Sequence, residues 1–441
     1  MSFPRYPQYK PSGVEWLGDV PEHWDVMRFQ RCVDVAEGQV DPEDAVFSRM
    51  SLIAPNHIES GTGRLLGLES ATEQGAESGK YLCKAGDVVY SKIRPALRKV
   101  CIAPEDCLCS ADMYPLRSHS GLINPFLFWL ILSEEFSALA VLESERVAMP
   151  KINRESLKAL MLAVPSSTEQ SAIASFLDRE TSKIDGLVGE QRRLMELLKE
   201  KRQAVISHAV TKGLNPHAPR KPSGIEWLGD VPEHWEVRRL KYVSPQITVG
   251  IVVEPSKYYV AEGVPSLRSL NIAPGAVTLE NLVFISDEAN ELHAKSKLSA
   301  GDLVAVRSGQ PGTTAVIPPE LEGCNCIDLI IIRKPTIGSE WFLCWYLASD
   351  VAVMQFSLGS GGAIQQHFNV GTAMDLVVPV PPAEEQNSIV DFINDQTAKF
   401  DALTGAAERG IELLQERRTA LISAAVTGQI DIRGLAETEA S

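Results

Sequence analysis

The cations best placed to bind nucleic acid are concentrated in one short stretch, KIRPALRK, at residues 92–99. Phosphate groups are bound by clustered positive charge, because each neutralised phosphate releases condensed counterions. No acidic residue occurs between Asp87 and Glu105, so this stretch is positive although the whole chain has a formal net charge of -15. We interpret it as a candidate DNA-contacting patch, with a solvated strand end and turn as the alternative. Its residues are Lys92, Arg94, Arg98 and Lys99.

Polar side chains suited to reading base edges occur in three further stretches, RSGQPGTT (307–314), MPKINR (149–154) and GAIQQHFN (362–369). In the major groove, arginine pairs well with guanine and glutamine with adenine. Asn, Gln and Ser are also ordinary turn residues, and that alternative stays open. The candidate side chains are Lys151, Asn153, Arg154, Arg307, Ser308, Gln310, Gln365, Gln366, His367 and Asn369.

The sequence lacks the motifs that would make the chain an enzyme. It has no Asn-Pro-Pro-aromatic or Asp-Pro-Pro-aromatic tetrapeptide of the kind adenine methyltransferases use. GAESGK at 75–80 is one residue short of the phosphate-cradling loop. The eight cysteines occur as singletons and C-x-C pairs, whereas zinc sites use C-x2-C knuckles. We expect no catalytic residues, no metal site, and buried, reduced thiols on strands.

Length and composition are those of an ordinary globular protein. The 441 residues suggest about three domains of roughly 150 residues each. The longest apolar run, FLFWLIL at 126–132, is far shorter than the roughly 18 residues of a membrane span. The N-terminus lacks the pattern of a secretory signal. We therefore expect a cytoplasmic protein.

The segments that position these residues occur twice in the sequence. PSGVEWLGDVPEHW (11–24) returns as PSGIEWLGDVPEHW (222–235), which we call the signatures. Downstream, EQSAIASFLDRETSKIDGL from Glu169 returns as EQNSIVDFINDQTAKFDAL from Glu385, an offset of 216. The chain is thus a tandem of two units, each with a signature, a variable body and a charged tail.

The two tails predict long helices. From Thr168 to Thr211 there is no proline, and a helix of this length would be about 60 Å long. Apolar residues recur near heptad spacing at Leu177, Ile184, Leu187, Leu194, Leu198 and Val205. So narrow a stripe needs a partner, and the nearest equivalent stripe is that of the other tail.

The bodies, roughly 25–166 and 236–382, predict a shared mixed α/β plan. Each has a strand opening on Gly-Asp, at 86–95 and 301–310, and later a helix capped by Asn124 or Ser339. The expected organisation is a first body with its signature, a long helix, a linker with the second signature and body, a second long helix, and a tail. The ranges are 1–166, 167–214, 215–382, 383–430 and 431–441.

The duplicated signature, together with VPSSTEQSAIASFL (164–177), VPPAEEQNSIVDFI (380–393) and the AVT that closes both helices, resembles the specificity (S) subunit of type I restriction-modification systems. The resemblance implies two target recognition domains separated by an antiparallel pair of helices, in phage defence. It implies docked methyltransferase subunits, two of them on that pattern, which would carry S-adenosylmethionine, and a nuclease subunit that can join them. Loops like the candidate stretches approach DNA in that family.

The residues alone lead to a compatible α+β arrangement. Two similar bodies on antiparallel helices have an approximate two-fold relation, so each could face one half of a split DNA target. Diverged bodies imply an asymmetric target. The signature tryptophans, Trp16, Trp24, Trp227 and Trp235, would dock each unit on the helices or on a methyltransferase subunit. His23 and His234 have no matched acid or nucleophile, so we expect them to pack and hydrogen-bond.

Two other classes of protein stay open at this point. One is a methyltransferase or nuclease whose motif has drifted beyond recognition. The other is a coiled-coil scaffold without a DNA role. Cofactor binding by the isolated chain would favour the first, and the absence of DNA binding would favour the second. The target bases do not follow from the sequence, because base pairing by side chains depends on docking geometry.

Overall fold

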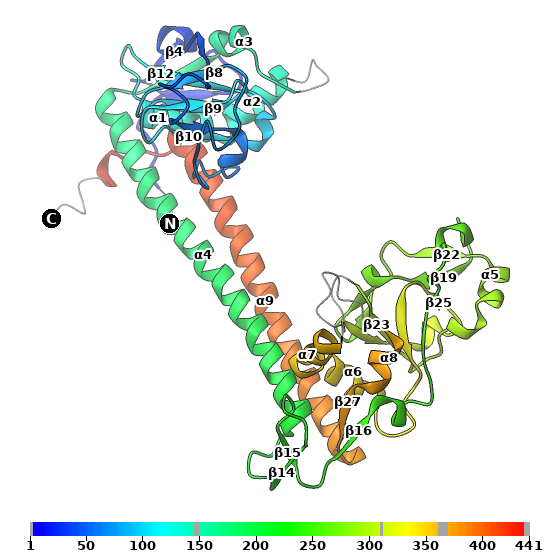
Figure 1. Ribbon diagram of the computed structural model, residues 1–441. Coiled ribbons are helices and arrows are strands. Elements are labelled where there is room, and N and C mark those ends of the chain that lie inside the picture. The colour runs from blue at the N-terminus through cyan, green and yellow to red at the C-terminus, as the bar shows by residue number, and fades with distance from the viewer. Residues whose placement is uncertain (1–2, 145–149, 309–311, 360–368, 436–441) are drawn as a thin grey trace. The chain divides into compact units, whose positions relative to one another are not determined.

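The computed structural model describes residues 3–144, 150–308, 312–359 and 369–435 (Figure 1). Contacts divide the chain into two compact units. Unit 1 comprises Met1–Gln191 and Glu408–Ser441, and unit 2 comprises Arg192–Ala407. The division falls within the two long helices, so each unit contains one body and one end of both helices.

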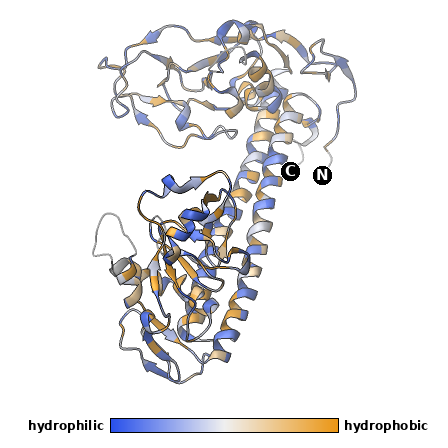
Figure 2. Ribbon diagram, turned by 90° about the vertical axis from the view of Figure 1, so that its right-hand side faces the viewer, coloured by the Kyte–Doolittle hydropathy of each residue, from blue (hydrophilic) through white to orange (hydrophobic). Residues whose placement is uncertain are grey.

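The predicted long helices are present as α4 (Ser167–Lys212) and α9 (Ala383–Val426). Figure 2 shows hydrophobic residues recurring along both helices among hydrophilic ones. Ile184 and Leu198 of the predicted stripe are buried, but Leu187 and Leu194 are exposed. A straight helix of 3.6 residues per turn drifts away from a 3.5-residue repeat, which moves some heptad positions out of the seam.

The two helices pack antiparallel in each unit. In unit 1, Arg418 of α9 donates to Asp185 of α4 at 2.9 Å. In unit 2, Arg202 of α4 pairs with Asp401 of α9. The offset of 216 relates Asp185 to Asp401 and Arg202 to Arg418, so the two ion pairs are equivalent under the repeat. This register confirms the predicted antiparallel pairing.

Body 1 contains two sheets. The first is antiparallel, in the order β10 (Val100–Ile102), β9 (Val88–Ser91), β12 (Met113–Ser118) and β4 (Val33–Val35). The second has the order β5 (Gln39–Val40), β8 (Lys80–Cys83), β11 (Cys107–Cys109), β6 (Ser51–Ile53) and β7 (Glu69–Ser70), with β11 and β6 parallel. The buried helix α1 (Asn124–Leu132) packs on the first sheet, followed by α2 (Glu134–Ser144) and α3 (Arg154–Ala159).

Body 2 repeats this plan with changes. Its first sheet has the order β17 (Ile247–Val249), β26 (Leu329–Ile332), β23 (Leu303–Val306) and β24 (Thr314–Val316). Its second has the order β18 (Tyr259–Val260), β22 (Val283–Ile285), β19 (Val264–Leu267) and β25 (Asn325–Cys326). The remaining elements are β20 (Ile272–Ala273), β21 (Ala276–Val277), α5 (Asp287–Leu292), α6 (Glu340–Leu347), α7 (Asp350–Gly359) and α8 (Val370–Asp375).

The chain enters and leaves each body on neighbouring strands. β3 (Asp25–Arg28) pairs with β13 (Met161–Val164) in unit 1, and β16 (Glu236–Arg239) pairs with β27 (Val377–Val380) in unit 2. Each signature lies just before, in a hairpin of β1 (Tyr9–Pro11) with β2 (Asp19–Pro21), or of β14 (Arg220–Pro222) with β15 (Asp230–Pro232). Each body is therefore inserted between a signature and a long helix.

The Gly-Asp turn that opens β9 and β23 has a structural explanation. Asp87 is buried and accepts hydrogen bonds from the Lys84 amide and the Arg117 guanidinium. This bond to Asp87 raises the pKa of Arg117. In unit 2 the buried Asp302 accepts from Arg333 in the same way. The turn thus ties the start of one central strand to the end of its neighbour.

Two sequence predictions need correction, the cap of α1 and the placement of the cysteines. Ser339 caps α6 as expected, accepting from the Phe342 amide, but the N-cap of α1 is Ile123. Asn124 instead joins neighbouring loops, accepting from the Ser118 amide and donating to the Gly86 carbonyl. All eight cysteines are free and buried, yet not all are on strands, since Cys344, for example, lies in α6.

No single helix in the described part of the chain is long and apolar enough to cross a membrane; α1 and α2 meet that criterion only as a pair bent by 67°.

Candidate nucleic-acid interface

Two stretches predicted separately, KIRPALRK and MPKINR, lie together in body 1. Ile93 forms an antiparallel bridge with Lys151. The Ile152 amide donates to the Lys92 carbonyl at 2.9 Å, and the Arg94 amide donates to the Pro150 carbonyl at 3.0 Å. The end of β9 and the loop before α3 therefore form one surface.

Only part of the predicted patch is available on this surface. Arg94 and Lys151 are exposed on adjacent backbones. The Lys92 ammonium donates to the Ala111 carbonyl at 2.6 Å and lies 5.4 Å from the Tyr114 ring centroid. The Lys99 ammonium donates to the Pro55 carbonyl at 2.6 Å. Because these lysines already have protein partners, Arg94 and Lys151 are the better candidates for phosphate contacts.

Arg98 faces another part of unit 1. It lines a cavity between body 1 and α9, together with Glu134, Glu412 and Glu416. The φ angles of Arg94 and Arg98 are 48° and 47°, the left-handed region, at the two ends of the turn that joins β9 to β10. This tight turn sends the two arginines to different surroundings, so the four predicted cations do not form one patch.

The other two candidates of body 1 have structural roles. The Asn153 side chain caps α3 by accepting from the Ser156 amide at 2.8 Å. Arg154 donates to the carbonyls of Val35 and Ala36 and lies 4.8 Å from the Tyr114 ring centroid. For Asn153, the turn alternative is therefore the observed one, and Arg154 holds the loop before α3 against β4.

In unit 2, three of the candidates lie in described residues. Arg307 pairs with Asp328 at 2.6 Å, and Ser308 follows it in the loop after β23. Asn369 caps α8 by accepting from the Thr372 amide, which repeats the role of Asn153. Gln310, Gln365, Gln366 and His367 lie outside the described residues.

The first signature clamps the point where α4 begins and α9 ends. Its hairpin brings Trp24, fully buried, against Gly428 just beyond α9. Glu169, in the first turn of α4, accepts hydrogen bonds from the Trp24 indole at 3.1 Å and the Tyr6 hydroxyl at 2.6 Å. His23 Nε2 lies 2.9 Å from the same carboxylate. Burial and the bond to Glu169 raise the pKa of Tyr6.

The second signature makes the same clamp at the opposite ends of the helices. Trp235 is fully buried and donates to Glu385 at 3.0 Å, and His234 Nε2 lies 2.6 Å from that carboxylate. Gly213, just after α4, lies against the Trp235 ring. His23 and His234 thus hydrogen-bond as expected, but the premise that they have no matched acid was wrong, since each lies against a glutamate of the long helices.

These clamps change the interpretation of the four tryptophans. Trp24 and Trp235 are buried against the chain's own helices, so they are not available to bind a partner protein. Trp16 and Trp227 are half-buried and keep part of their rings accessible. Of the two roles predicted for the signature, docking on the helices is the one that the buried pair performs.

The clamps differ in burial, which gives a test of their strength. The Glu169 side chain is 5% exposed and the Glu385 side chain 26%. We expect Glu169→Ala to destabilise the first clamp by about 2–5 kcal/mol, because buried donors lose their acceptor. Glu385→Ala should cost about 1–2 kcal/mol because water can replace the carboxylate.

Hydrogen-exchange mass spectrometry measures the two clamps separately, in peptides from 3–28 and 214–239. Each variant should lose protection in its own clamp, with the larger loss for Glu169→Ala. Glu169→Gln is the control, because Trp24 and Tyr6 both donate to Oε1 and an amide oxygen can still accept both bonds. If Glu169→Ala and Glu385→Ala caused equal losses of protection in their clamps, burial would not determine the strength of the clamps.

Sequence reasoning missed several residues that organise the site. Glu169 and Glu385 stand at identical positions of the repeat, and so do Arg117 and Arg333. The comparison at the offset of 216 aligned Glu169 with Glu385 but did not assign them a contact; the same offset, extended into the diverged bodies, would have found Arg117 and Arg333 as a charged pair kept in both copies. Within the described residues, no group of three or more His, Cys, Asp or Glu side chains could hold a metal ion.

Comparison with known proteins agrees with this organisation. A family model described as the type I restriction modification DNA specificity domain matches residues 46–192. The EcoDI specificity subunit of Escherichia coli is 33% identical over 193 residues, which are 44% of this chain and 43% of the relative. The putative MjaX specificity subunit of Methanocaldococcus jannaschii is 25% identical over 440 residues, covering 95% of this chain and 96% of the relative.

Solved structures share the fold. A chain from a structure of a type I R-M system aligns with a TM-score of 0.74 at 18% identity, over 93% of this chain and 99% of that one. The HsdS subunit of Thermoanaerobacter tengcongensis aligns with a TM-score of 0.53 at 18% identity, over 93% and 98%. Fold and clamps define a duplicated protein with two α/β bodies on paired antiparallel helices. The chain is thus similar over nearly its whole length to specificity subunits of type I restriction-modification systems, and residues 46–192 match the model of their DNA specificity domain.

Proposed function

We propose that each body of this specificity subunit reads one half of a split, asymmetric DNA target, and that α4 and α9 set the unread spacer. The proposal rests on the observation that the two bodies share a structural framework but differ in their loops. Both bodies keep the buried Asp–Arg contact and the Asn cap of the helix before the last strand. The strands that follow the shared Asp lead into unlike residues, Lys92-Ile93-Arg94 after β9 and Arg307-Ser308 after β23.

Different side chains on equivalent frames favour different base sequences in the two half-sites, because base edges are read by side-chain donors and acceptors. Phosphate contacts would come from exposed cations such as Arg94 and Lys151. The formal net charge of -15 does not oppose this role, since it is the local charge at the contact surface that neutralises phosphates.

We expect the double variant Arg94→Ala/Lys151→Ala to weaken DNA binding and to lower the slope of log affinity against log salt by about two. Each phosphate contact contributes about 0.9 to that slope. The measurement is a salt titration of DNA affinity for the complex with its methyltransferase subunit.

Arg98→Ala/Lys99→Ala is the matched control, with the same change of charge in the same stretch. Arg98 lines the cavity beside α9 and Lys99 bonds to Pro55, so the slope should stay unchanged. If the salt slope fell for Arg98→Ala/Lys99→Ala but stayed unchanged for Arg94→Ala/Lys151→Ala, the phosphate contacts would lie elsewhere.

The helices are the proposed docking surface for two methyltransferase subunits. Leu187 and Leu413 are exposed in unit 1, and their repeat equivalents Leu403 and Leu197 are exposed in unit 2. Exposed apolar side chains at equivalent positions suit one partner per unit. In this proposal the chain itself is non-catalytic and binds no cofactor, the partner binds S-adenosylmethionine, a nuclease subunit can join, and the complex acts on DNA in the cytoplasm.

A further inference from the structure

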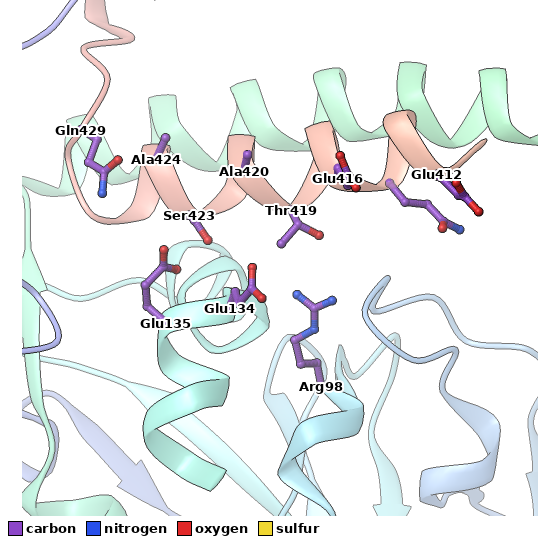
Figure 3. A pocket seen from close by; sticks show the side chains of 11 residues that line it. Arg98, Glu134, Glu135, Glu412, Glu416, Thr419, Ala420, Ser423, Ala424 and Gln429 are labelled. Carbon is purple, nitrogen blue, oxygen red and sulfur yellow. The ribbon is translucent and has the colours of Figure 1, made fainter. Parts of the chain in front are cut away.

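A cavity of about 650 Å³ lies in unit 1 between body 1 and α9 (Figure 3). Its walls come from the turn after β9, from the start of α2 and from the last third of α9. The lining residues that carry charge or a hydroxyl are Arg98, Glu134, Glu135, Glu412, Glu416, Thr419 and Ser423. Four carboxylates and one guanidinium therefore line the cavity, which is strongly negative.

The glutamates of this cavity are not neutralised within the chain. None of the four forms an ion pair within 4.0 Å with another described residue. Glu412 and Glu416 are four residues apart on α9, an arrangement in which like charges destabilise a helix. The repeat keeps glutamate at both equivalent positions of α4, Glu196 and Glu200, which also line a cavity in unit 2.

Two residues that line this cavity each have a buried polar atom without a hydrogen-bond partner among the described residues. Ser423 is only 8% exposed, and its hydroxyl has no hydrogen bond among the described residues. The same holds for Oε2 of Glu135. Figure 3 shows the Ser423 hydroxyl directed toward the Glu135 carboxylate. Buried hydroxyl and carboxylate oxygens are normally hydrogen-bonded. Even a Ser423 hydroxyl that donates to Glu135 keeps lone pairs that can accept, so an additional donor fits at this point.

Unit 2 shows what the same serine does when the body closes on the helix. Ser207, the equivalent of Ser423, accepts a hydrogen bond from the Asp350 amide at 2.9 Å. Gln203, the equivalent of Thr419, donates to the Ala348 carbonyl at 2.8 Å. The start of α7 thus satisfies the serine in unit 2, whereas in unit 1 the carboxylates of Glu134 and Glu135 stand at the start of α2.

We propose that the unit 1 cavity binds a basic side chain, arginine or lysine, supplied by a segment of the methyltransferase subunit. Guanidinium and ammonium groups carry only donors, which suits Ser423 Oγ and Glu135 Oε2, and their charge offsets the glutamates. The lining positions of α9 run from Glu412 to Ala424, about 18 Å of helix, which is longer than a small cation needs. This inference rests on the proposed function, because it names the partner.

The test variant is Glu412→Gln/Glu416→Gln in the full chain. Both side chains are exposed and unpaired, so the fold should be retained while two charges are removed. The matched control is Glu190→Gln/Glu408→Gln, which removes two exposed charges of unit 1 outside the cavity, one from α4 and one from α9.

The first arm is calorimetric titration with acetylated hexa-arginine amide. We expect about tenfold weaker binding for the cavity variant, and less than a twofold change for the control. Equal losses in both variants would show that the peptide senses only overall charge, and would overturn the proposal. Undiminished peptide binding in the presence of saturating spermidine is also expected; full displacement would indicate a small-cation site instead.

The second arm measures the affinity of each variant for the methyltransferase subunit. We expect weaker assembly for the cavity variant alone, with an unchanged methylated motif once the complex is saturated. If the wild-type chain assembles and both variants assemble equally well, this inference is wrong and the proposed function stands. If the wild-type chain does not assemble at all, the proposed function itself fails.

Discussion

Replacement of residues 25–166 by the first body of another specificity subunit is expected to change one half of the methylated DNA motif and to leave the other half intact. The ends of this segment fall on natural boundaries. Residue 25 opens β3 and follows Trp24 directly, and β13, the partner of β3, ends at Val164. The exchange therefore carries the β3–β13 pair with the body and leaves the clamp between Trp24 and Glu169 in place.

The measurement is the motif methylated in cells that express the hybrid chain with the methyltransferase subunit. Exchange of residues 236–382 is the reciprocal experiment, because β16 and β27 bound body 2 in the same way. It should change the other half-site only. A hybrid in which both halves change would refute the assignment of one body to one half-site.

The sequence predicts the parts of this fold that local pattern determines. Periodicity and the lack of proline predicted α4 and α9 closely, because a long amphipathic helix is specified by residues near in sequence. The repeated Gly-Asp predicted the starts of β9 and β23, since the turn needs a glycine with positive φ at Gly86 and Gly301. The pairing of the two helices followed from the need to bury two equivalent stripes, whereas their antiparallel direction was implied by the family resemblance.

Side-chain roles in the loops could not be predicted in the same way. Arg94 and Arg98 are four residues apart, and only the left-handed turn between them separates the exposed Arg94 from the cavity beside α9 that Arg98 lines. The sequence around Asn153 is compatible both with reading a base and with capping a helix, and the structure shows the cap. Such choices depend on contacts between distant segments, for example Ile93 with Lys151, which spacing does not reveal.

The paired helices provide the second large effect, a change in the spacer of the DNA target. Four residues inserted after Gly189 lengthen α4 by about 6 Å. A Cβ placed on Gly189 would have no atom within 4 Å, so the insertion point is open. Since B-DNA rises about 3.4 Å per base pair, length alone allows a spacer longer by at most about two base pairs.

The rotation of the lengthened helix reduces the expected increase in the DNA spacer to one base pair. Four residues turn an α-helix by about 40° beyond a full turn, because each residue contributes about 100°. One base pair turns B-DNA by about 35°, given 10 to 10.5 base pairs per turn. Two base pairs would turn a half-site by about 70°, which the longer helix does not match. We expect the half-site bases to stay the same, since neither body is altered.

Activity of the single insertion should fall, because four residues do not complete a heptad and α9 is unchanged. The matched control inserts four residues into both helices at opposite positions. The pairs Asp185–Arg418 and Arg202–Asp401 place Gly189 opposite Leu414, so the second insertion belongs between Leu413 and Leu414. It restores the register of both ion pairs and should recover activity with the longer spacer. A fully active double insertion whose methylated motif keeps its original spacer would show that the helices do not set the distance between the half-sites.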